Sequence, residues 1–297
     1  MIEVRPLRDD EVDLYVALRT RVHPQTPMPR EIVLDDRKQP DHLDLLALLD
    51  GEPAGVASTA VFGGAPNGDL AFVTLRVPRE NRRQGIGTAL HRRASEHART
   101  LGKSRFYCVI RGDDPDSHGY YGGHGYEEVG RMQDVHLDLA GFQMPPPATF
   151  EIVPIGPELE AAVYEVALEA DADIPSGESH ESGTFEQWRG RHFGSEIVLR
   201  ELSFAAIENG RVIGYTILGR HDAETAGNWM TGVARSARGR GVALALKRHQ
   251  AAAARAAGWQ GIRAQNDLSN GPMLRVNEKL GFRPLFEWVH LTGPLIG

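Results

Sequence analysis

The fold of this chain is decided by one stretch, Val77-Pro78-Arg79-Glu80-Asn81-Arg82-Arg83-Gln84-Gly85-Ile86-Gly87-Thr88-Ala89-Leu90. It leads from an apolar segment through a basic turn into a helical pattern that opens with Gly-x-Gly. The first amides of a helix have no partner within the helix, and the helix dipole favours an anion beside them. Glycine also lets a ligand approach the backbone closely. The stretch therefore predicts a strand, a diphosphate-binding turn and a helix.

A second stretch repeats this pattern, Val233-Ala234-Arg235-Ser236-Ala237-Arg238-Gly239-Arg240-Gly241-Val242-Ala243-Leu244-Ala245-Leu246. It has the same basic turn and opens its helix with Gly-x-Ala. A glycine followed by an aromatic residue stands 40 residues beyond each helix start, at Gly125-Tyr126 and at Gly281-Phe282. Chance explains one such match but is a poor explanation for two in register. The spacing therefore predicts an internal duplication.

Other segments follow the same duplicated plan. Asp50-Gly51 and Asn209-Gly210 predict tight β-hairpins. The run 141–149 contains three consecutive prolines, which neither a helix nor a central strand tolerates. We therefore expect an N-terminal domain over residues 1–140, a proline-rich linker over 141–149 and a C-terminal domain over 150–297. Residues 22–41 are rich in proline and charge and are expected to be irregular.

Both stretches resemble the coenzyme A pyrophosphate loop of the GNAT acyltransferases, whose pattern is Arg/Gln-x-x-Gly-x-Gly/Ala after a strand that ends in Val. The resemblance covers nearly the whole chain, as two GNAT domains in tandem, a layout like that of mycothiol synthases or antibiotic N-acetyltransferases. It implies an α/β (α+β) fold. Each copy would hold a mixed, mostly antiparallel sheet that is flanked by helices and opens between its fourth and fifth strands for the pantetheine arm.

The resemblance also implies acetyl-CoA as the cofactor and an N-acetyltransferase that acts on the primary amine of a small molecule. The backbone amide at or beside Val77, and its counterpart at Val233, would bind the carbonyl oxygen. The residues expected to hold the cofactor are Val77, Arg82, Arg83, Gln84, Gly85, Ile86, Gly87 and Thr88 in the first copy and Val233, Arg238, Gly239, Arg240, Gly241, Val242 and Ala243 in the second.

One position distinguishes the two copies. The family commonly places a Tyr four residues before the Gly-aromatic pair, where it protonates the departing thiolate. Tyr121 stands there in the first copy and Asn277 in the second, and a carboxamide is not a useful acid. The first copy is therefore expected to be catalytic. The alternative for Tyr121 is a packing residue with a polar tip.

The base has a weaker assignment. Some members of the family carry an acidic residue eight positions before the strand-end Val, and Asp69 stands there. An Asp that caps the turn over residues 63–68 is an equally good interpretation. His118 and His124 flank Tyr121 and titrate in the useful range, and an ordered water chain would leave no residue to name. The acidic run 113–116 either draws a cationic amine or forms a solvated turn.

Composition limits the classes of function. The hydrophobic fraction of 41% and the charged fraction of 25% over 297 residues are typical of a soluble protein with two domains. The net charge of -7 argues against nucleic acid or an anionic membrane as a partner. No signal-peptide layout or membrane-spanning apolar run is visible, so the cytoplasm is expected. Cys108 is the one cysteine, in a segment that predicts a buried strand, and no metal-ligand spacing is present.

Two alternatives remain beside the main prediction, and a third class is rejected. Activity could reside in the C-terminal copy, or one copy could be a non-catalytic module that binds coenzyme A or a partner. A dinucleotide-binding oxidoreductase needs Gly-x-Gly-x-x-Gly, but Leu90 stands where the third glycine belongs, so this class is rejected. The sequence does not fix the acceptor, the acyl length or the oligomeric state, and a homodimer is one possibility.

Overall fold

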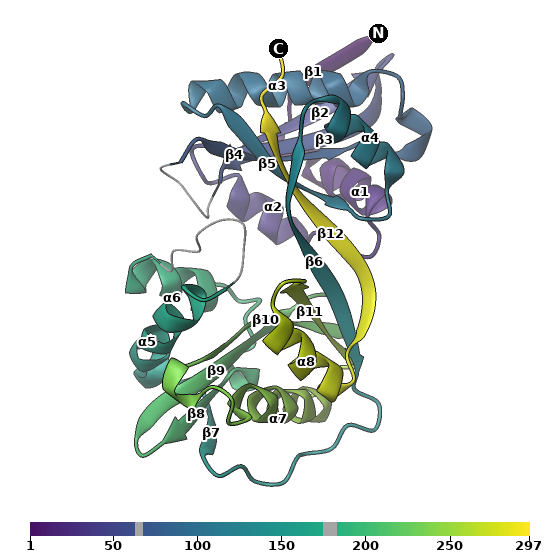
Figure 1. Ribbon diagram of the computed structural model, residues 1–297. Coiled ribbons are helices and arrows are strands. Elements are labelled where there is room, and N and C mark those ends of the chain that lie inside the picture. The colour runs from purple at the N-terminus through teal and green to yellow at the C-terminus, as the bar shows by residue number, and fades with distance from the viewer. Residues whose placement is uncertain (63–67, 175–182) are drawn as a thin grey trace. The chain divides into compact units, whose positions relative to one another are not determined.

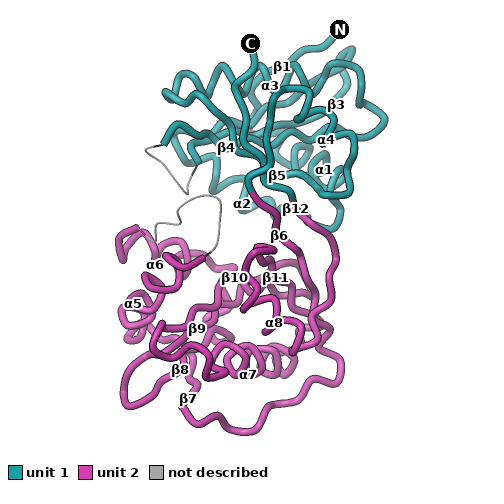
Figure 2. The backbone as a smooth tube through the Cα atoms, in the orientation of Figure 1, with its two compact units in different colours: residues 1–129, 289–297 teal, residues 130–288 magenta. Residues whose placement is uncertain are grey.

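The computed structural model describes residues 1–62, 68–174 and 183–297. The chain divides into two compact units, shown in Figure 2. Unit 1 contains residues 1–129 together with 289–297, and unit 2 contains residues 130–288. Each unit has a sheet with helices on its faces (Figure 1), so the predicted α/β class is confirmed.

Unit 1 begins with a strand, two helices and a β-meander. Its β4 and β5 are joined by the long helix α3, and α4 follows. The element bounds are β1 Ile2–Pro6, α1 Val12–Val22, α2 Arg30–Asp36, β2 Leu43–Leu49, β3 Glu52–Val61, β4 Leu70–Arg76, α3 Ile86–Thr100, β5 Arg105–Arg111, α4 Pro115–Gly123 and β6 Glu127–Asp138, with short 3-10 turns at Asp9–Glu11 and Arg79–Asn81.

The sheet of unit 1 runs in the order β1-β2-β3-β4-β5. Its neighbours are antiparallel except for β4 and β5, which are parallel and need α3 as their crossover. Helix α3 buries Ile86, Leu90, Ala94 and Ala98 on one face of the sheet, at the helical spacing seen in the sequence. Helices α1 and α2 pack on the other face. The loop that enters α3 is therefore held at the carboxyl end of β4.

Unit 2 repeats this plan. Its sheet order is β7-β8-β9-β10-β11, again antiparallel except for β10 and β11. The element bounds are β7 Glu151–Pro154, α5 Glu160–Asp171, α6 Phe185–Phe193, β8 Phe204–Glu208, β9 Arg211–Arg220, β10 Thr225–Val233, α7 Val242–Ala256, β11 Gly261–Asp267, α8 Gly271–Leu280 and β12 Arg283–Pro294, with 3-10 turns at Pro157–Leu159, Arg200–Leu202 and Arg235–Ala237.

The units do not follow the expected ranges 1–140 and 150–297. Residues 130–138 of β6 belong to unit 2, where they pair with β11 and bury Val135 and Leu137. Residues 289–297 belong to unit 1, where Val289 and Leu291 enter the core. The proline run over 141–149 therefore lies within unit 2. Each unit thus takes its closing strand from the other half of the sequence.

Local turn chemistry agrees with the sequence at both hairpins. Asp50 and Gly51 have φ angles of 52° and 89°, and Asn209 and Gly210 have φ angles of 50° and 73°, as the tight turn type predicted by these pairs requires. The prediction of irregular structure over residues 22–41 is wrong in part, because α2 forms there. Pro29 precedes this helix with a φ of -58°, which suits a helix start.

A buried histidine in unit 1 predicts a pH-dependent stability. His91 is 0% exposed, and its ring nitrogens lie 3.1 Å from the Tyr120 hydroxyl and 2.9 Å from the Tyr126 hydroxyl. Burial lowers the pKa of His91 to about 3, whereas an unfolded histidine titrates near ~6.5. The unfolded state therefore binds the extra proton between these values, and the free energy of unfolding should fall by up to ~1.4 kcal/mol for each pH unit below 6.5.

The check is denaturant unfolding of the protein at pH 6.5 and at pH 4.5, measured for the wild type and for a His91→Gln variant. The glutamine keeps the hydrogen-bonding capacity but does not titrate in this window, so its stability should depend less on pH. Equal pH dependence of the two proteins would show that His91 does not carry the effect.

Candidate active site

The site of unit 1 begins where two parallel strands separate. Strands β4 and β5 pair only from Leu70↔Arg105 to Phe72↔Tyr107, although β4 continues to Arg76 and β5 to Arg111. The backbone of β4 beyond Phe72 is therefore not paired with β5. This opening lies at the carboxyl ends of the strands, next to the turn that enters α3, so a narrow ligand can reach the backbone there.

The turn into α3 has the conformation that the sequence predicted. Gly85 is the N-cap residue and adopts a left-handed conformation with φ 86°, which favours glycine. Ile86 is the first residue of the helix and is buried in the core, so its packing holds the start of the helix in place. A Cβ at Gly87 would stand 4.0 Å from the Val77 side chain. The first amides of α3 are thus presented beside the end of β4.

The motif arginine braces this turn. Arg82 Nε donates to the Val77 carbonyl at 3.2 Å, and its terminal nitrogens bind both Asp114 carboxylate oxygens at 3.0 and 3.1 Å. Asp114 also accepts from the Ser117 hydroxyl at 2.9 Å and caps α4. Asp116 accepts from Arg82 at 3.2 Å and from Arg83 at 3.2 Å. The acidic run therefore ties the turn to α4, and its carboxylates are paired with arginines.

A cavity of about 310 Å³ joins these elements. Of the residues expected from the sequence, Val77, Arg82, Arg83, Gly85, Gly87, Thr88 and Tyr121 line it. Two of the residues expected to hold the cofactor do not line it: Ile86 lies in the core, and Gln84 is exposed and donates to the Glu80 carbonyl at 3.2 Å. The other residues of the lining are Val22, His23, Leu75, Arg76, Ile110, Arg111, Asp114, Asp116, Ser117, Tyr120 and His124.

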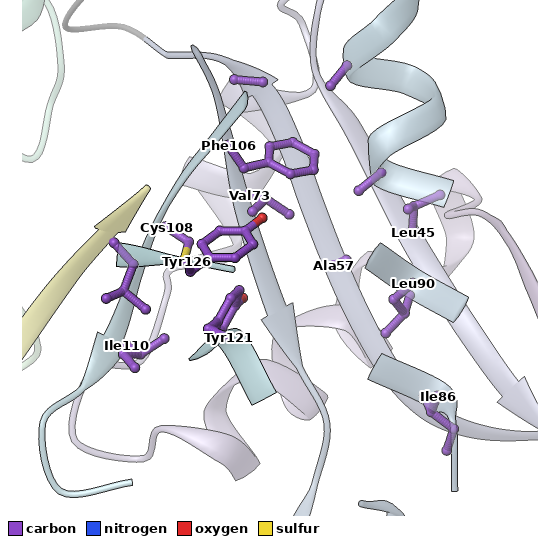
Figure 3. Close-up of a cluster of buried hydrophobic side chains, with 14 of the residues drawn as sticks. Leu45, Ala57, Val73, Ile86, Leu90, Phe106, Cys108, Ile110, Tyr121 and Tyr126 are labelled. Atoms are coloured by element: carbon purple, nitrogen blue, oxygen red, sulfur yellow. The ribbon is translucent and has the colours of Figure 1, made fainter. Parts of the chain in front are cut away.

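Tyr121 reaches the cavity from α4 and is only 4% exposed. It lies in one buried cluster with Tyr126 and with Cys108 of β5, and Figure 3 shows these three side chains together in the core of unit 1. Burial raises the pKa of Tyr121 well above its usual value. The phenol is therefore a proton donor at neutral pH. Burial also raises the pKa of Cys108 to about 12, so this thiol is an inert core residue, as predicted.

Asp69 is placed apart from the other predicted residues. It is exposed at the amino end of β4, its carbonyl accepts from the Ser104 amide at 3.0 Å, and it does not line the cavity. Eight residues of strand span roughly 26 Å, so Val77 lies far along the strand. Its assignment as a base stays a prediction that this placement does not support. Residues 63–67 of the turn that Asp69 would cap lie outside the described residues.

The histidines near Tyr121 have local partners. His124 lines the cavity and donates from Nδ1 to the Tyr120 carbonyl at 2.7 Å, while His118 Nε2 lies 3.1 Å from the Gly112 carbonyl. A third histidine, His23 at the end of α1, was not anticipated and also lines the cavity. Burial, with a contribution from nearby arginines, lowers the pKa of His23 to about 3, so its imidazole is neutral.

Unit 2 builds the same opening. Strands β10 and β11 pair only from Thr225↔Gly261 to Asn228↔Ala264, and Gly241 caps α7 with φ 81°. Arg238 Nε donates to the Val233 carbonyl at 3.1 Å, as Arg82 does to Val77, and another Arg238 nitrogen binds Asp173 at 2.7 Å. A cavity of about 580 Å³ is lined by six of the predicted residues, Val233, Arg238, Gly239, Gly241, Val242 and Ala243. The seventh predicted residue, Arg240, does not line the cavity, and its Nη2 donates to Glu208 Oε1 at 2.5 Å.

Unit 2 differs from unit 1 at two matching positions. Asn277 takes the position of Tyr121, is 3% exposed and has no hydrogen-bond partner for its amide among the described residues. Gly232 takes the position of Arg76, and a Cβ there would collide with the buried ring of Tyr215. Unit 2 thus keeps the turn but has neither the phenol nor the arginine.

Sequence reasoning missed the arginines on the α1 side of unit 1, Arg19 and Arg76. Arg76 lines the cavity. Arg19 is not part of the lining and donates to the Thr74 hydroxyl at 3.4 Å. The available signal was the position of Arg76 directly before Val77, in a strand whose other residues are apolar except for Thr74. A charged residue at the end of a buried strand marks a candidate site.

The sequence model of the acetyltransferase (GNAT) family matches this chain twice, over residues 8–126 and 163–282. No curated protein matches the chain. A GCN5-related N-acetyltransferase from Sphaerobacter thermophilus has a similar structure, with 22% identity and a TM-score of 0.80 over 100% of this chain and 96% of that one. A tandem GNAT protein from the clavulanic acid biosynthesis pathway gives 21% identity and a TM-score of 0.79, over 100% and 99%.

A third similar structure is the glucosamine N-acetyltransferase region of a fungal multi-domain β-N-acetylglucosaminidase. It has 18% identity and a TM-score of 0.78, over 98% of this chain and 38% of that one. The structural similarity to these three proteins establishes a shared fold, and the double match of the family model establishes the duplication. Within the described residues, helices that combine the length and apolar character needed to traverse a bilayer are absent.

Proposed function

Because the chain belongs to the GNAT acetyltransferase family, we propose that unit 1 transfers an acetyl group from acetyl-CoA to the primary amine of a small molecule. The observation that carries this proposal is the position of Tyr121. A buried, protonated phenol lines the same cavity as the glycine turn of α3, at the point where β4 and β5 separate. An acid, an anion-binding helix start and unpaired strand backbone are the groups that thioester chemistry requires.

The residues of unit 1 fit the cofactor. The amides from Gly85 to Thr88 suit the diphosphate, because they are the first amides of α3 and the turn before them is basic. Arg82 is already paired with Asp114, so its contribution is to hold the turn in place, while Arg83 is exposed beside it. The opening between β4 and β5 suits the thin pantetheine arm. When bound, acetyl-CoA supplies the acetyl group as a thioester.

Each residue at the opening has a distinct task in this proposal. The amide at Val77 donates a hydrogen bond to the acetyl carbonyl oxygen, which gains negative charge as the amine nitrogen attacks. The carbon–sulfur bond breaks, and Tyr121 gives its proton to the sulfur. The amine loses one proton to solvent and Tyr121 regains one, so the products are an acetamide and the free thiol. An ordinary ammonium has a pKa near ~10.4, so only its neutral fraction reacts.

For unit 2 we propose coenzyme A binding without efficient turnover. Its larger cavity and complete glycine turn favour a bound cofactor. Asn277 in place of Tyr121 removes the proton donor, and Gly232 removes the cation on the acceptor side. The alternative, in which unit 2 is the active one, is separated from this proposal by the variants described in the Discussion.

The experiment for this proposal is thiol release from acetyl-CoA in the presence of a panel of primary amines, with the products examined by mass spectrometry. An amine that gains one acetyl group, with one thiol released for each product, is the expected result. Thiol release at the same rate without any amine would indicate a hydrolase instead.

A further inference from the structure

From the arginines beside the opening, we infer that the acceptor of unit 1 carries a carboxylate next to its reacting amine. This inference deepens the proposed function and rests on it. It concerns the α1 side of β4, opposite the face that packs against α3. The groups there are Arg76, Arg19, Thr74 and Tyr15, together called the Arg76 subsite.

The alternation of side chains along β4 separates two faces. Val73, Leu75 and Val77 pack with α3, on the same side as the glycine turn. Thr74 and Arg76 therefore point to the other face, where α1 lies. Thr74 shares a hydrogen bond of 2.8 Å with Ser58 of β3, and the hydroxyl of Thr74 also accepts from Arg19. The Arg76 subsite is thus separate from the proposed diphosphate site but lies directly beside Val77.

Among the described residues, neither arginine of this subsite forms an ion pair with a carboxylate. Arg76 makes a hydrogen bond of 3.1 Å to the Leu75 carbonyl, and among the described residues it has no carboxylate partner. Arg19 donates to two neutral oxygens, the Tyr15 hydroxyl at 3.0 Å and the Thr74 hydroxyl, and it lies over the Tyr15 ring at 5.5 Å. By contrast, the neighbouring Arg82 and Arg111 are both paired with aspartates.

The two unpaired arginines also repel one another. Burial lowers the pKa of Arg76 to about 10, and Arg19 lowers it further in the same direction. A guanidinium remains charged at neutral pH even so. A partly buried cation of this kind, held against another cation, is destabilising until an anion binds. Because Arg76 lines the cavity, a ligand is able to supply that anion.

The position of Arg76 fixes the chemical class of the ligand. Arg76 immediately precedes Val77, whose amide is proposed to bind the acetyl carbonyl. Arg76 and Val77 also line the same cavity, so one small molecule can contact both, with its amine and its anion separated by only a few bonds. Guanidinium groups bind carboxylates through two parallel hydrogen bonds, which gives both affinity and orientation. A small amino acid, or an amine with an equivalent carboxylate, has this arrangement, whereas a simple alkylamine does not.

Unit 2 provides an internal contrast. Gly232 stands at the position of Arg76, and the Tyr215 ring occupies the space that a side chain would need. The copy that lacks the phenol thus also lacks the anion-binding arginine. The joint loss is expected if both residues serve one reaction in unit 1.

The test compares amino acids with their own carboxamides, which keep the amine and remove the charge. Acetylation kinetics are measured for each pair, and each member is also titrated calorimetrically into protein saturated with coenzyme A. We expect the best carboxylate acceptor to exceed its carboxamide by about 100-fold in kcat/KM, as for a buried charge-assisted pair. Arg76→Gln should remove this preference, and Arg76→Lys should restore about a tenth of it.

The matched control is Arg93→Gln, an exposed arginine of α3 that pairs with Glu96 and lies outside the cavity. It should keep the preference for carboxylates, and Arg76→Gln should keep the affinity for acetyl-CoA. Carboxamides that react as well as carboxylates would overturn the inference while leaving the proposed function intact. Panel members that neither bind nor react would also count against it. A wild-type protein that does not bind acetyl-CoA would instead contradict the proposed function.

Discussion

Gly85→Glu is expected to lower the affinity of unit 1 for acetyl-CoA by at least about 100-fold, equivalent to ~2.7 kcal/mol. Gly85 is the N-cap of α3 and is exposed, so a glutamate there places a negative charge where the diphosphate is proposed to bind. The left-handed φ of 86° adds backbone strain for any residue with a Cβ. Calorimetric titration of acetyl-CoA measures the loss, and kcat/KM should fall by a similar factor.

Gly102→Glu is the matched control for that variant. Gly102 also has a left-handed φ, of 72°, and lies beyond the other end of α3, where a Cβ would meet no atom within 4 Å. It introduces the same charge and the same kind of strain away from the cavity, so binding should stay close to that of the wild type. Equal losses in the two variants would mean that stability, and not the anion site, accounts for the effect.

Tyr121→Phe is expected to lower kcat by about 100-fold with little change in KM, because it removes the proposed proton donor and keeps the ring. The raised pKa of Tyr121 also determines the pH dependence. The phenol stays protonated throughout the range in which an amine loses its proton. The rate for the wild type should therefore rise with pH up to about 10 without a descending limb from Tyr121.

Tyr126→Phe serves as the control for the loss of a hydroxyl. Tyr126 belongs to the same aromatic cluster, with its ring centre 4.9 Å from that of Tyr121, but it does not line the cavity. Phe282 stands at its position in unit 2, so the fold accepts phenylalanine there. This variant should keep kcat within a few-fold of the wild type. If Tyr121→Phe behaves in the same way, Tyr121 is a packing residue, as the alternative interpretation held.

Much of the fold followed from local patterns in the sequence. The apolar residues of α3 recur at helical spacing, and this stripe is the one that is buried. Asn270 is a residue type that commonly caps helices, and it caps α8 by accepting from the Met273 amide at 3.2 Å. Asp50-Gly51 forms the predicted tight turn. In each case, neighbours within a few residues determine the conformation, so the local sequence is sufficient to predict it.

The parts that were not predicted depend on distant contacts. Nothing local to Val289 and Leu291 shows that they enter the core of unit 1. The charge state of the Arg76 subsite was equally hidden, because the pairing of an arginine depends on every element packed around it. The assignment of Asp69 as a base stays a prediction, and its place outside the cavity shows that a sequence spacing does not by itself establish a position in the cavity.

The central claim is that unit 1 is the working enzyme, and one comparison tests it most directly. The rate of thiol release with an amine acceptor is measured for Gly85→Glu and for Gly241→Glu, which places the same charge at the matching N-cap of α7. We predict that Gly85→Glu loses turnover and that Gly241→Glu retains at least half of it. Turnover that survives in Gly85→Glu and is lost in Gly241→Glu would contradict the account and place the chemistry in unit 2, without a tyrosine at position 277.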